Sequence, residues 1–293
     1  MKKTWLITGC SSGLGRSLAK ETLKQGYNVV VTARNTDTIQ EIVDQYPQSA
    51  LGIVLDVTNQ ESIRNAVKQA IDYFGFIDIL VNNAGYGYRS AIEEGTRQDI
   101  SKLFETNVWG PVALIKQVLP FMRAKHQGAI INVSSIAAIH ASMGSGYYAA
   151  SKSALESISE SLKKEVEPLG IKVMIVEPGA FRTNFTGSSL TQSPKAIEDY
   201  ALTAGTRRIE KEKNHGKQPG NPDQAAPLII QAIESEKTPL RLLLGSDAVN
   251  YAHDMLAEHQ KDYDKWCELS KKTDYKKAVS YTHLRAHETG AYL

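Results

Sequence analysis

Short apolar runs rich in β-branched residues alternate along the chain with segments of helical periodicity. Most of the runs are continuously apolar, which is typical of strands covered on both faces of a sheet. Such alternation indicates parallel strands joined by right-handed crossovers. The sequence therefore predicts a doubly wound α/β fold, a seven-stranded parallel sheet flanked by helices. The predicted strands are Thr4–Thr8, Asn28–Thr32, Leu51–Leu55, Asp78–Val81, Ala129–Val133, Ile171–Val176 and Leu240–Leu244.

Two segments between the runs carry clear helix signals. Leu14–Gln25 spaces its apolar residues along one helix face and is followed by Gly26, a common stop signal. Ser62–Phe74 repeats that spacing. No repeat or low-complexity linker divides the 293 residues, of which 42% are apolar. We therefore expect a single domain over residues 1–278.

Residues 184–221 interrupt the alternation of predicted strands and helices. The stretch is rich in Ser, Thr, Lys, Gly and Gln, and we expect no strand within it. Long insertions of this kind are often functional or mobile, so we interpret the stretch as a lid over a pocket. A solvated helical excursion is the alternative.

The last residues, Val279–Leu293, show neither a helical face nor a strand pattern. They resemble a translated sequencing-library adaptor, and we expect the natural sequence to stop near Ala278. Deleting residues 279–293 should leave stability and activity unchanged. His283 and His287 stand four residues apart, but we expect no metal there.

Composition narrows the range of partners. The net charge of +2 points to neither nucleic acid nor a membrane surface. Cys10 and Cys267 are far apart, which predicts no metal site and no disulfide framework and fits a reducing compartment. The apolar stretch Trp5–Ile7 is shorter than the roughly 7–15 residues of an export signal. No apolar run approaches the ~20 residues of a membrane span. We expect a soluble cytoplasmic protein.

A glycine-rich loop joins the first predicted strand to the first predicted helix. Gly9, Gly13 and Gly15 allow positive φ angles and a close backbone approach. The helix that follows presents free N–H groups to an anion. The spacing Gly-x-x-x-Gly-x-Gly differs from the commoner Gly-x-Gly-x-x-Gly, but its context predicts a site for a dinucleotide pyrophosphate. A plain glycine-rich turn is the alternative.

Further short motifs follow the loop in a fixed order. They are LDVT at Leu55–Thr58, NNAG at Asn82–Gly85, Asn107, INVSS at Ile131–Ser135, YAASK at Tyr148–Lys152, and EPG at Glu177–Gly179 with Thr183. Together with the loop they resemble the short-chain dehydrogenase/reductase family from residue 4 to about 183, and strands and helices continue the match to about 275. The resemblance implies a Rossmann-like fold and an NAD(P)-dependent oxidoreductase.

The resemblance also implies a catalytic set, and two adjacent tyrosines raise the question of which one reacts. Tyr148 has Lys152 one helical turn later, whereas Tyr147 has Ser151 there. An ammonium near a phenol favours the phenolate, so we expect Lys152 to lower the Tyr148 pKa from about 10 towards neutral pH. The implied catalytic residues are Asn107, Ser135, Tyr148 and Lys152.

Each member of the set has an expected role. Tyr148 is the general acid and base, and Ser135 polarises the substrate oxygen. Lys152 also holds the nicotinamide ribose, and Asn107 binds a water of a proton relay, as the family implies. Ser134, the neighbour of Ser135, should face the other way by strand alternation.

The end of the second strand bears on the choice of dinucleotide. An acidic residue there would bind the adenosine ribose, but Ala33 occupies the position and Arg34 follows. A guanidinium suits a phosphate, so NADP(H) is predicted over NAD(H). Asp56, at the end of the third predicted strand, resembles the family residue that binds the adenine amino group. The alternatives are that Arg34 merely stacks on adenine and that Asp56 forms an ordinary Asx turn. The predicted cofactor-binding residues are Gly9, Ser11, Ser12, Gly13, Leu14, Gly15, Arg34, Asp56, Val57, Asn83, Ala84, Gly85, Tyr148, Lys152, Pro178, Gly179 and Thr183.

Aromatic and apolar residues beside the motifs predict a hydrophobic ketone, aldehyde or secondary alcohol as substrate. The family often forms homodimers or homotetramers, here through Ile100–Lys125 and Tyr148–Val166. Two alternatives stay open: a dinucleotide-sensing regulator without turnover, and an epimerase-like or dehydratase-like enzyme. The candidate pocket residues are Ser135, Tyr86, Tyr88, His140, Met143, Phe181 and Phe185.

Overall fold

The computed structural model describes residues 2–187, 189–209 and 216–275. The chain divides into a large unit, Met1–Ala252, and a small unit, His253–Leu293. The predicted boundary at residue 278 and the adaptor-like stretch 279–293 both lie outside the described residues, as do His283 and His287. Within the described ranges, no helix combines the length and apolar character that crossing a membrane requires.

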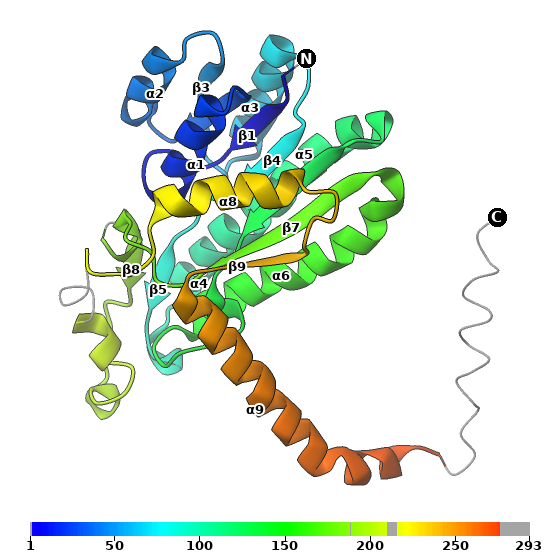
Figure 1. The fold of residues 1–293 in the computed structure, drawn as a ribbon. Coiled ribbons are helices and arrows are strands. Elements are labelled where there is room, and N and C mark those ends of the chain that lie inside the picture. The colour runs from blue at the N-terminus through cyan, green and yellow to red at the C-terminus, as the bar shows by residue number, and fades with distance from the viewer. Residues whose placement is uncertain (1, 188, 210–215, 276–293) are drawn as a thin grey trace. The chain divides into compact units, whose positions relative to one another are not determined.

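A seven-stranded parallel sheet forms the centre of the large unit (Figure 1). Its order is β3-β2-β1-β4-β6-β7-β9. Every predicted strand is present within two residues of its expected bounds, which confirms the predicted fold class. The strands are β1 Thr4–Ile7, β2 Asn28–Ala33, β3 Ala50–Val54, β4 Ile79–Asn82, β6 Gly128–Val133, β7 Ile171–Pro178 and β9 Arg241–Leu244.

The order reverses at β1, which pairs with β2 on one side and with β4 on the other. Trp5 is in register with Val29 of β2 and Ile79 of β4. Where the strand order reverses, the loops that follow two adjacent strands lead in opposite directions and leave a crevice between them. Ligands of such folds bind in that crevice. The carboxyl ends of β1 and β4 therefore mark the expected ligand edge.

Side-chain alternation sends the strands' apolar residues into two cores. Trp5 and Ile7 of β1 belong to one core and Leu6 to the other. The first core is closed by α1 (Gly13–Lys24), α2 (Gln40–Gln45) and α8 (Pro222–Glu234). The second is closed by α3 (Gln60–Phe74), α5 (Gly110–Lys125) and α6 (Gly146–Val166). Two further helices are α4 (Arg97–Phe104) and α9 (Ser246–Ser270).

Local signals explain where the helices begin and end. The Asn59 side chain caps α3 by accepting hydrogen bonds from the amides of Glu61 and Ser62, both at 2.9 Å. Gly75 stops the helix in the left-handed region, at φ 83°. The predicted helices Leu14–Gln25 and Ser62–Phe74 are thus confirmed as α1 and α3, with small differences at their ends.

The prediction that residues 184–221 contain no strand is wrong. Leu190–Gln192 forms β8, which pairs in parallel with β5 (Gly87–Arg89) in a separate two-stranded sheet. Three residues, two of them polar, give no apolar run for a sequence pattern to detect. The strand exists because β5 offers it a backbone partner.

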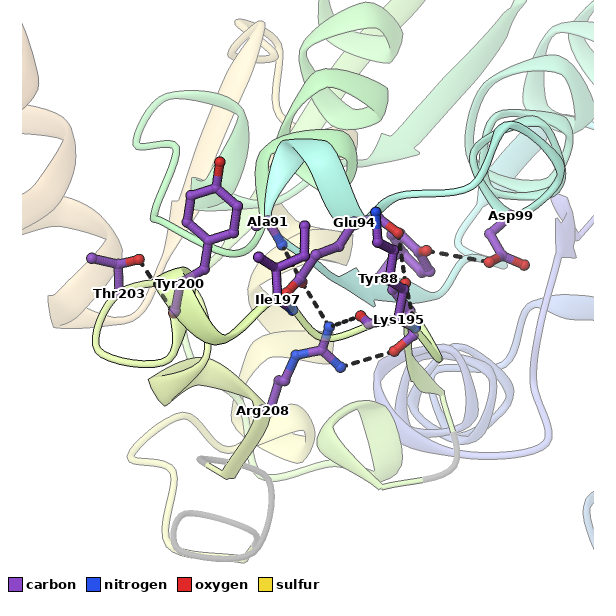
Figure 2. A network of polar contacts seen from close by, with 10 residues as sticks. Tyr88, Ala91, Glu94, Asp99, Lys195, Ile197, Tyr200, Thr203 and Arg208 are labelled. Carbon is purple, nitrogen blue, oxygen red and sulfur yellow. Dashed lines mark hydrogen bonds and ion pairs between the residues drawn. The ribbon is translucent and has the colours of Figure 1, made fainter.

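A buried ion pair fixes the same stretch further along (Figure 2). Arg208 lies 2.6 Å from the carboxylate of Glu94, whose side chain is only 2% exposed. The amides of Ala91 and Ile197 also donate to this carboxylate, at 2.8 and 2.9 Å. Although burial opposes it, the hydrogen bonds from Ile197, Arg208 and Ala91 lower the pKa of Glu94. The described part of the stretch is therefore anchored to the turn Ile92–Glu94.

Candidate active site

Tyr148 lies where the first turn of α6 meets the end of β6. It is only 7% exposed, and its phenol lies beside Ser135, which follows β6 by two residues. Its ring lies 5.6 Å from that of Phe185. Burial raises the pKa of Tyr148, while the hydrogen bond with Ser135 and the positive charge of Arg89 act against this rise. The protein holds the phenol in its protonated form.

Tyr147 has different surroundings. Its hydroxyl donates to the backbone oxygen of Ile92 at 2.7 Å. Its ring lies so close to Gly95 that a Cβ atom there would be 2.3 Å from a ring carbon. The two neighbouring tyrosines thus point to separate places, and only Tyr148 meets Ser135.

Lys152 lies one turn further along α6 and is 5% exposed. Its Nζ atom donates to the carbonyl oxygen of Val133, the last residue of β6, at 2.9 Å. Burial lowers the pKa of Lys152 to about 8, and the negative charge of Glu156 partly opposes this. The expectation that Lys152 lowers the Tyr148 pKa is wrong for this structure. Burial of the phenol is the largest effect, and the cation that counters it is Arg89.

Asn107 is fully buried in a π-helical turn, Glu105–Trp109, between α4 and α5. Its side chain accepts from the Tyr86 amide at 3.1 Å and donates to the Tyr86 carbonyl at 3.0 Å. It also donates to Ser151 of α6 at 3.1 Å. Single π turns inside α-helices are frequent at functional sites. Here the turn places one amide side chain between the loop after β4 and α6.

Gly85 brings that loop against the same side chains. A Cβ atom on Gly85 would lie 3.1 Å from Oδ1 of Asn107 and 3.4 Å from Nζ of Lys152. The backbone after β4 therefore passes directly beside Asn107 and Lys152.

The glycine loop, Gly9–Gly15, is packed against the segments that the sequence links to it. Gly9 and Gly13 have φ angles of 72° and 59°, which glycine adopts freely. A Cβ atom on Gly15 would lie 2.3 Å from Nδ2 of Asn83, and one on Gly13 would lie 3.2 Å from Cβ of Thr183. The Asn83 amide in turn donates to the carbonyls of Thr8 and Gly9, at 2.8 and 3.2 Å.

The start of α1 has the properties that a bound diphosphate requires. The absence of side chains on Gly9, Gly13 and Gly15 lets the loop pack closely on Ala84, Thr183 and Asn83, whose nearest atoms would lie 2.3–3.2 Å from an added Cβ atom. Ser12 caps α1 without a side-chain hydrogen bond, and the first turn holds no acidic residue. Exposed N–H groups without a competing carboxylate are what an anion requires.

The other predicted cofactor residues lie along the same edge of the sheet. Arg34 is exposed immediately after β2, and Ser11 is exposed in the glycine loop, where Leu14 is half-buried. Asp56 accepts from the amide and hydroxyl of Thr58, at 2.9 and 2.7 Å, so the Asx turn considered as an alternative is present. Val57 is buried against Gly110, and the Ala84 amide donates to the Thr8 hydroxyl at 2.9 Å.

Asp247 orders the turn that follows β7. The turn begins at Pro178 and Gly179, and the Ala180 amide donates to Oδ2 of Asp247 at 2.6 Å. A Cβ atom on Gly179 would clash with the same carboxylate, at 2.2 Å. Thr183 then caps the next turn by accepting from the Phe185 amide at 3.2 Å.

The predicted pocket residues are only partly brought together. Phe185 lies beside Tyr148, and the backbone of Tyr86 is bonded to Asn107. Phe181 instead packs on the first core and against Gly220. His140 stacks on Tyr251 with 4.8 Å between ring centroids, Met143 is 62% exposed, and Tyr88 is buried.

Sequence reasoning missed Arg89, the last residue of β5. Its guanidinium donates to the hydroxyl of Ser145, the residue before α6, and its charge acts on Tyr148. No motif marks this arginine, because β5 is only three residues long and joins the site through the fold.

A buried acidic cluster behind Lys152 was also missed. Ser134, the residue before Ser135, donates to Glu156 at 2.5 Å. Glu156 is 5% exposed and Glu177 of β7 is 0% exposed. Burial raises the pKa of both carboxyls, and burial followed by the charge of Glu156 brings that of Glu177 to about 7. The signal for Glu156 was its position four residues after Lys152, on the same helix face.

Comparisons with known proteins identify the family of the chain. The sequence model of the short chain dehydrogenase family matches residues 3–194. The oxidoreductase BOA17 of Botryotinia fuckeliana is 35% identical over 271 residues, which cover 92% of this chain and 98% of that protein. A 3-ketodihydrosphingosine reductase of Bacteroides thetaiotaomicron is 38% identical over 247 residues, covering 82% and 87% of the two chains.

A solved structure extends the likeness to the fold. The short-chain dehydrogenase from Streptomyces avermitilis has a TM-score of 0.88 and 41% sequence identity, covering 93% of this chain and 98% of that one. Sequence, fold and the geometry of the site lead to the same conclusion: the chain belongs to the short-chain dehydrogenase/reductase family and is an oxidoreductase.

Proposed function

We propose that this enzyme transfers a hydride between NADP(H) and a hydrophobic ketone, aldehyde or secondary alcohol, with Tyr148 as the general acid and base. The observation that carries the proposal is the placement of the buried Tyr148 phenol beside Ser135, one helical turn from Lys152, at the carboxyl edge of the sheet. The glycine loop, which suits a diphosphate, lies at the same edge.

The geometry gives each side chain a task. In the reductive direction the Tyr148 phenol donates its proton to the substrate oxygen, and burial favours the protonated form that this step needs. The Ser135 hydroxyl holds the substrate oxygen close to the phenol. Lys152 and Asn107 form the polar floor beside Gly85. The dinucleotide, when bound, supplies or accepts the hydride.

The preference for NADP(H) rests on the end of β2. Solved structures with this fold include complexes with NADP and with NAD, so the fold alone does not choose between them. Arg34 is exposed at the position where a 2′-phosphate would arrive, and Ala33 offers no carboxylate to a ribose. Ser11 and Ser12 add hydroxyl donors in the neighbouring loop.

Replacing Arg34 tests the cofactor proposal. We expect the parent protein to bind NADPH at least tenfold more tightly than NADH, a difference of about 1.4 kcal/mol. Arg34→Ala should remove most of that preference by weakening NADPH binding while leaving NADH binding nearly unchanged. Fluorescence titration of each protein with both dinucleotides measures this.

A matched control is Arg64→Ala, which removes an exposed arginine from α3, away from the loop edge. It should keep the parent preference. Equal or tighter binding of NADH by the parent protein would refute the preference, and failure to bind either dinucleotide would refute the oxidoreductase proposal as a whole.

One aromatic ring beside the reacting phenol supports the proposed substrate class. Phe185 lies against Tyr148, and one relative is named for the reduction of a keto compound. A screen of hydrophobic ketones and aldehydes with NADPH is therefore the first assay. Isomerisation or dehydration without net hydride transfer would instead favour an epimerase-like or dehydratase-like enzyme.

Two further expectations belong to the proposal. We propose a homodimer or homotetramer formed through α5 and α6, and a cytoplasmic location. Residues 184–221 are proposed as a cover over the substrate, anchored through Glu94 and Arg208.

A further inference from the structure

Three successive residues at the end of β6 each contact a different turn of α6. The backbone oxygen of Val133 accepts from Lys152, the next side chain donates to Glu156, and the third lies beside Tyr148. The partners on α6 are spaced by one turn, so they lie on one helix face. The acidic residue is therefore as firmly placed as the two motif residues.

Glu156 is the near counter-charge of Lys152. Both side chains are 5% exposed. A buried ammonium without an anion loses its proton, because burial disfavours the charged form. Burial lowers the Lys152 pKa, and the charge of Glu156 acts in the opposite direction.

The charge of Glu156 depends in turn on Glu177 and Arg241. Glu177 projects from β7 beside Glu156 and is fully buried. Arg241 of β9 lies 3.3 Å from Glu156, 3.4 Å from Glu177 and 2.5 Å from Glu160. One half-exposed guanidinium thus faces three carboxyl groups. Two buried carboxylates side by side cannot both be charged without a large penalty, so they compete for one proton.

We propose that Glu156 is a positioning residue that keeps Lys152 an ammonium. The charge of Lys152, and with it the pH range of turnover, is then set by a residue outside the catalytic set. The effect on turnover rests on the proposed function, whereas the effect on the Lys152 charge does not.

Among the described residues, the charged and titratable groups that face this cluster come from four elements. α6 contributes Tyr148, Lys152, Glu156 and Glu160, β5 contributes Arg89, β7 contributes Glu177, and β9 contributes Arg241. The end of β6 adds only a hydroxyl and a carbonyl oxygen.

The direct test observes the ammonium of Lys152 by NMR. Protein labelled with ¹³C at lysine Cε is titrated, and the signal of Lys152 is identified by its loss in Lys152→Met. In the parent protein its midpoint should fall near pH 8. Glu156→Gln should move the midpoint down by at least about half a pH unit, a threefold change in the ratio of the two forms.

Two more variants serve as controls. Glu177 has a pKa of about 7 and is already largely ionised where Lys152 titrates, so Glu177→Gln should shift the Lys152 midpoint less than Glu156→Gln does. Glu160→Gln, the matched control one turn further along α6, should leave the midpoint unchanged. An unchanged midpoint in Glu156→Gln, or a larger downward shift in Glu177→Gln than in Glu156→Gln, would overturn the proposal.

Glu156→Asp keeps the negative charge and should restore a midpoint close to that of the parent. This variant also tests the proposal if Glu156→Gln fails to fold. A Lys152 midpoint that drops by about half a pH unit or more in Glu156→Asp, although the negative charge is kept, would count against a role for that charge.

The kinetic readout follows the same variants. The pH at which kcat/KM falls on the alkaline side should move down in Glu156→Gln and stay in Glu160→Gln. A shifted NMR midpoint with an unshifted kinetic profile would overturn the link to turnover. Shifted midpoints in a protein that turns over no carbonyl would support the charge assignment and refute the proposed function.

Discussion

Tyr147 and Tyr148 show that two adjacent residues of one helix can have different surroundings, one in a packing contact and the other at the candidate active site. The two phenols are adjacent in sequence, yet one is bonded to the Ile92 carbonyl and the other lies beside Ser135. Spacing relative to Lys152 was enough to choose between them. The direction of the Tyr148 pKa was not predictable, because it depends on how deeply the fold buries the phenol.

Replacing each tyrosine tests that separation. Tyr148→Phe should lower kcat by at least about 10²-fold, the lower range of general acid–base catalysis, while dinucleotide binding persists. Tyr147→Phe should retain most turnover and lose about 1 kcal/mol of stability with its hydrogen bond. Steady-state kinetics and thermal unfolding measure the two effects, and the reverse ranking in kcat would contradict the assignment.

Among the elements, the stretch 184–221 departs most from what the sequence suggested. Its strand β8 is too short and polar to predict, and Arg208 and Glu94 are 114 residues apart. A sequence pattern records neighbours along the chain, whereas this anchor depends on which loops the finished sheet brings together. The central strands were predictable because they are buried on both faces and read as apolar runs.

Replacing Arg208 tests whether its ion pair with Glu94 stabilises this stretch. Arg208→Met leaves the buried Glu94 carboxylate without its cation, which typically destabilises a protein by about 3–5 kcal/mol. The loss should be concentrated locally, so amide exchange should speed up in residues 190–208 more than in the sheet. Hydrogen exchange read by mass spectrometry measures this. Lys195→Met, an exposed neighbour, is the control and should change neither region.

At the scale of the whole molecule, buried charge links stability to pH. Glu177 binds a proton in the folded protein up to about pH 7, whereas an unfolded glutamate releases it near the reference value of 4.5. Between these values the folded state holds more protons, so this group's contribution to stability falls as the pH rises. Lys152 acts oppositely from about pH 8 towards 10.5, where the unfolded chain holds the extra proton.

Glu177→Gln isolates the first of these effects. Relative to the parent protein, the variant should gain stability progressively between about pH 4.5 and 7, by up to roughly 3 kcal/mol. Urea unfolding at several pH values measures the difference. A difference in unfolding free energy that stays constant across this range would show that the Glu177 proton is not retained on folding.

The contacts between the end of β6 and three turns of α6 have a consequence for how such an enzyme can diverge. The segment between them includes residues 136–144, which carry none of these contacts, whereas Ser145 and Tyr147 are held by Arg89 and Ile92. A single residue added inside β6 would displace the partners of the acid, the ammonium and its counter-charge together. We therefore expect changes within residues 136–144 to disturb the reacting groups less than changes at either end of the connection.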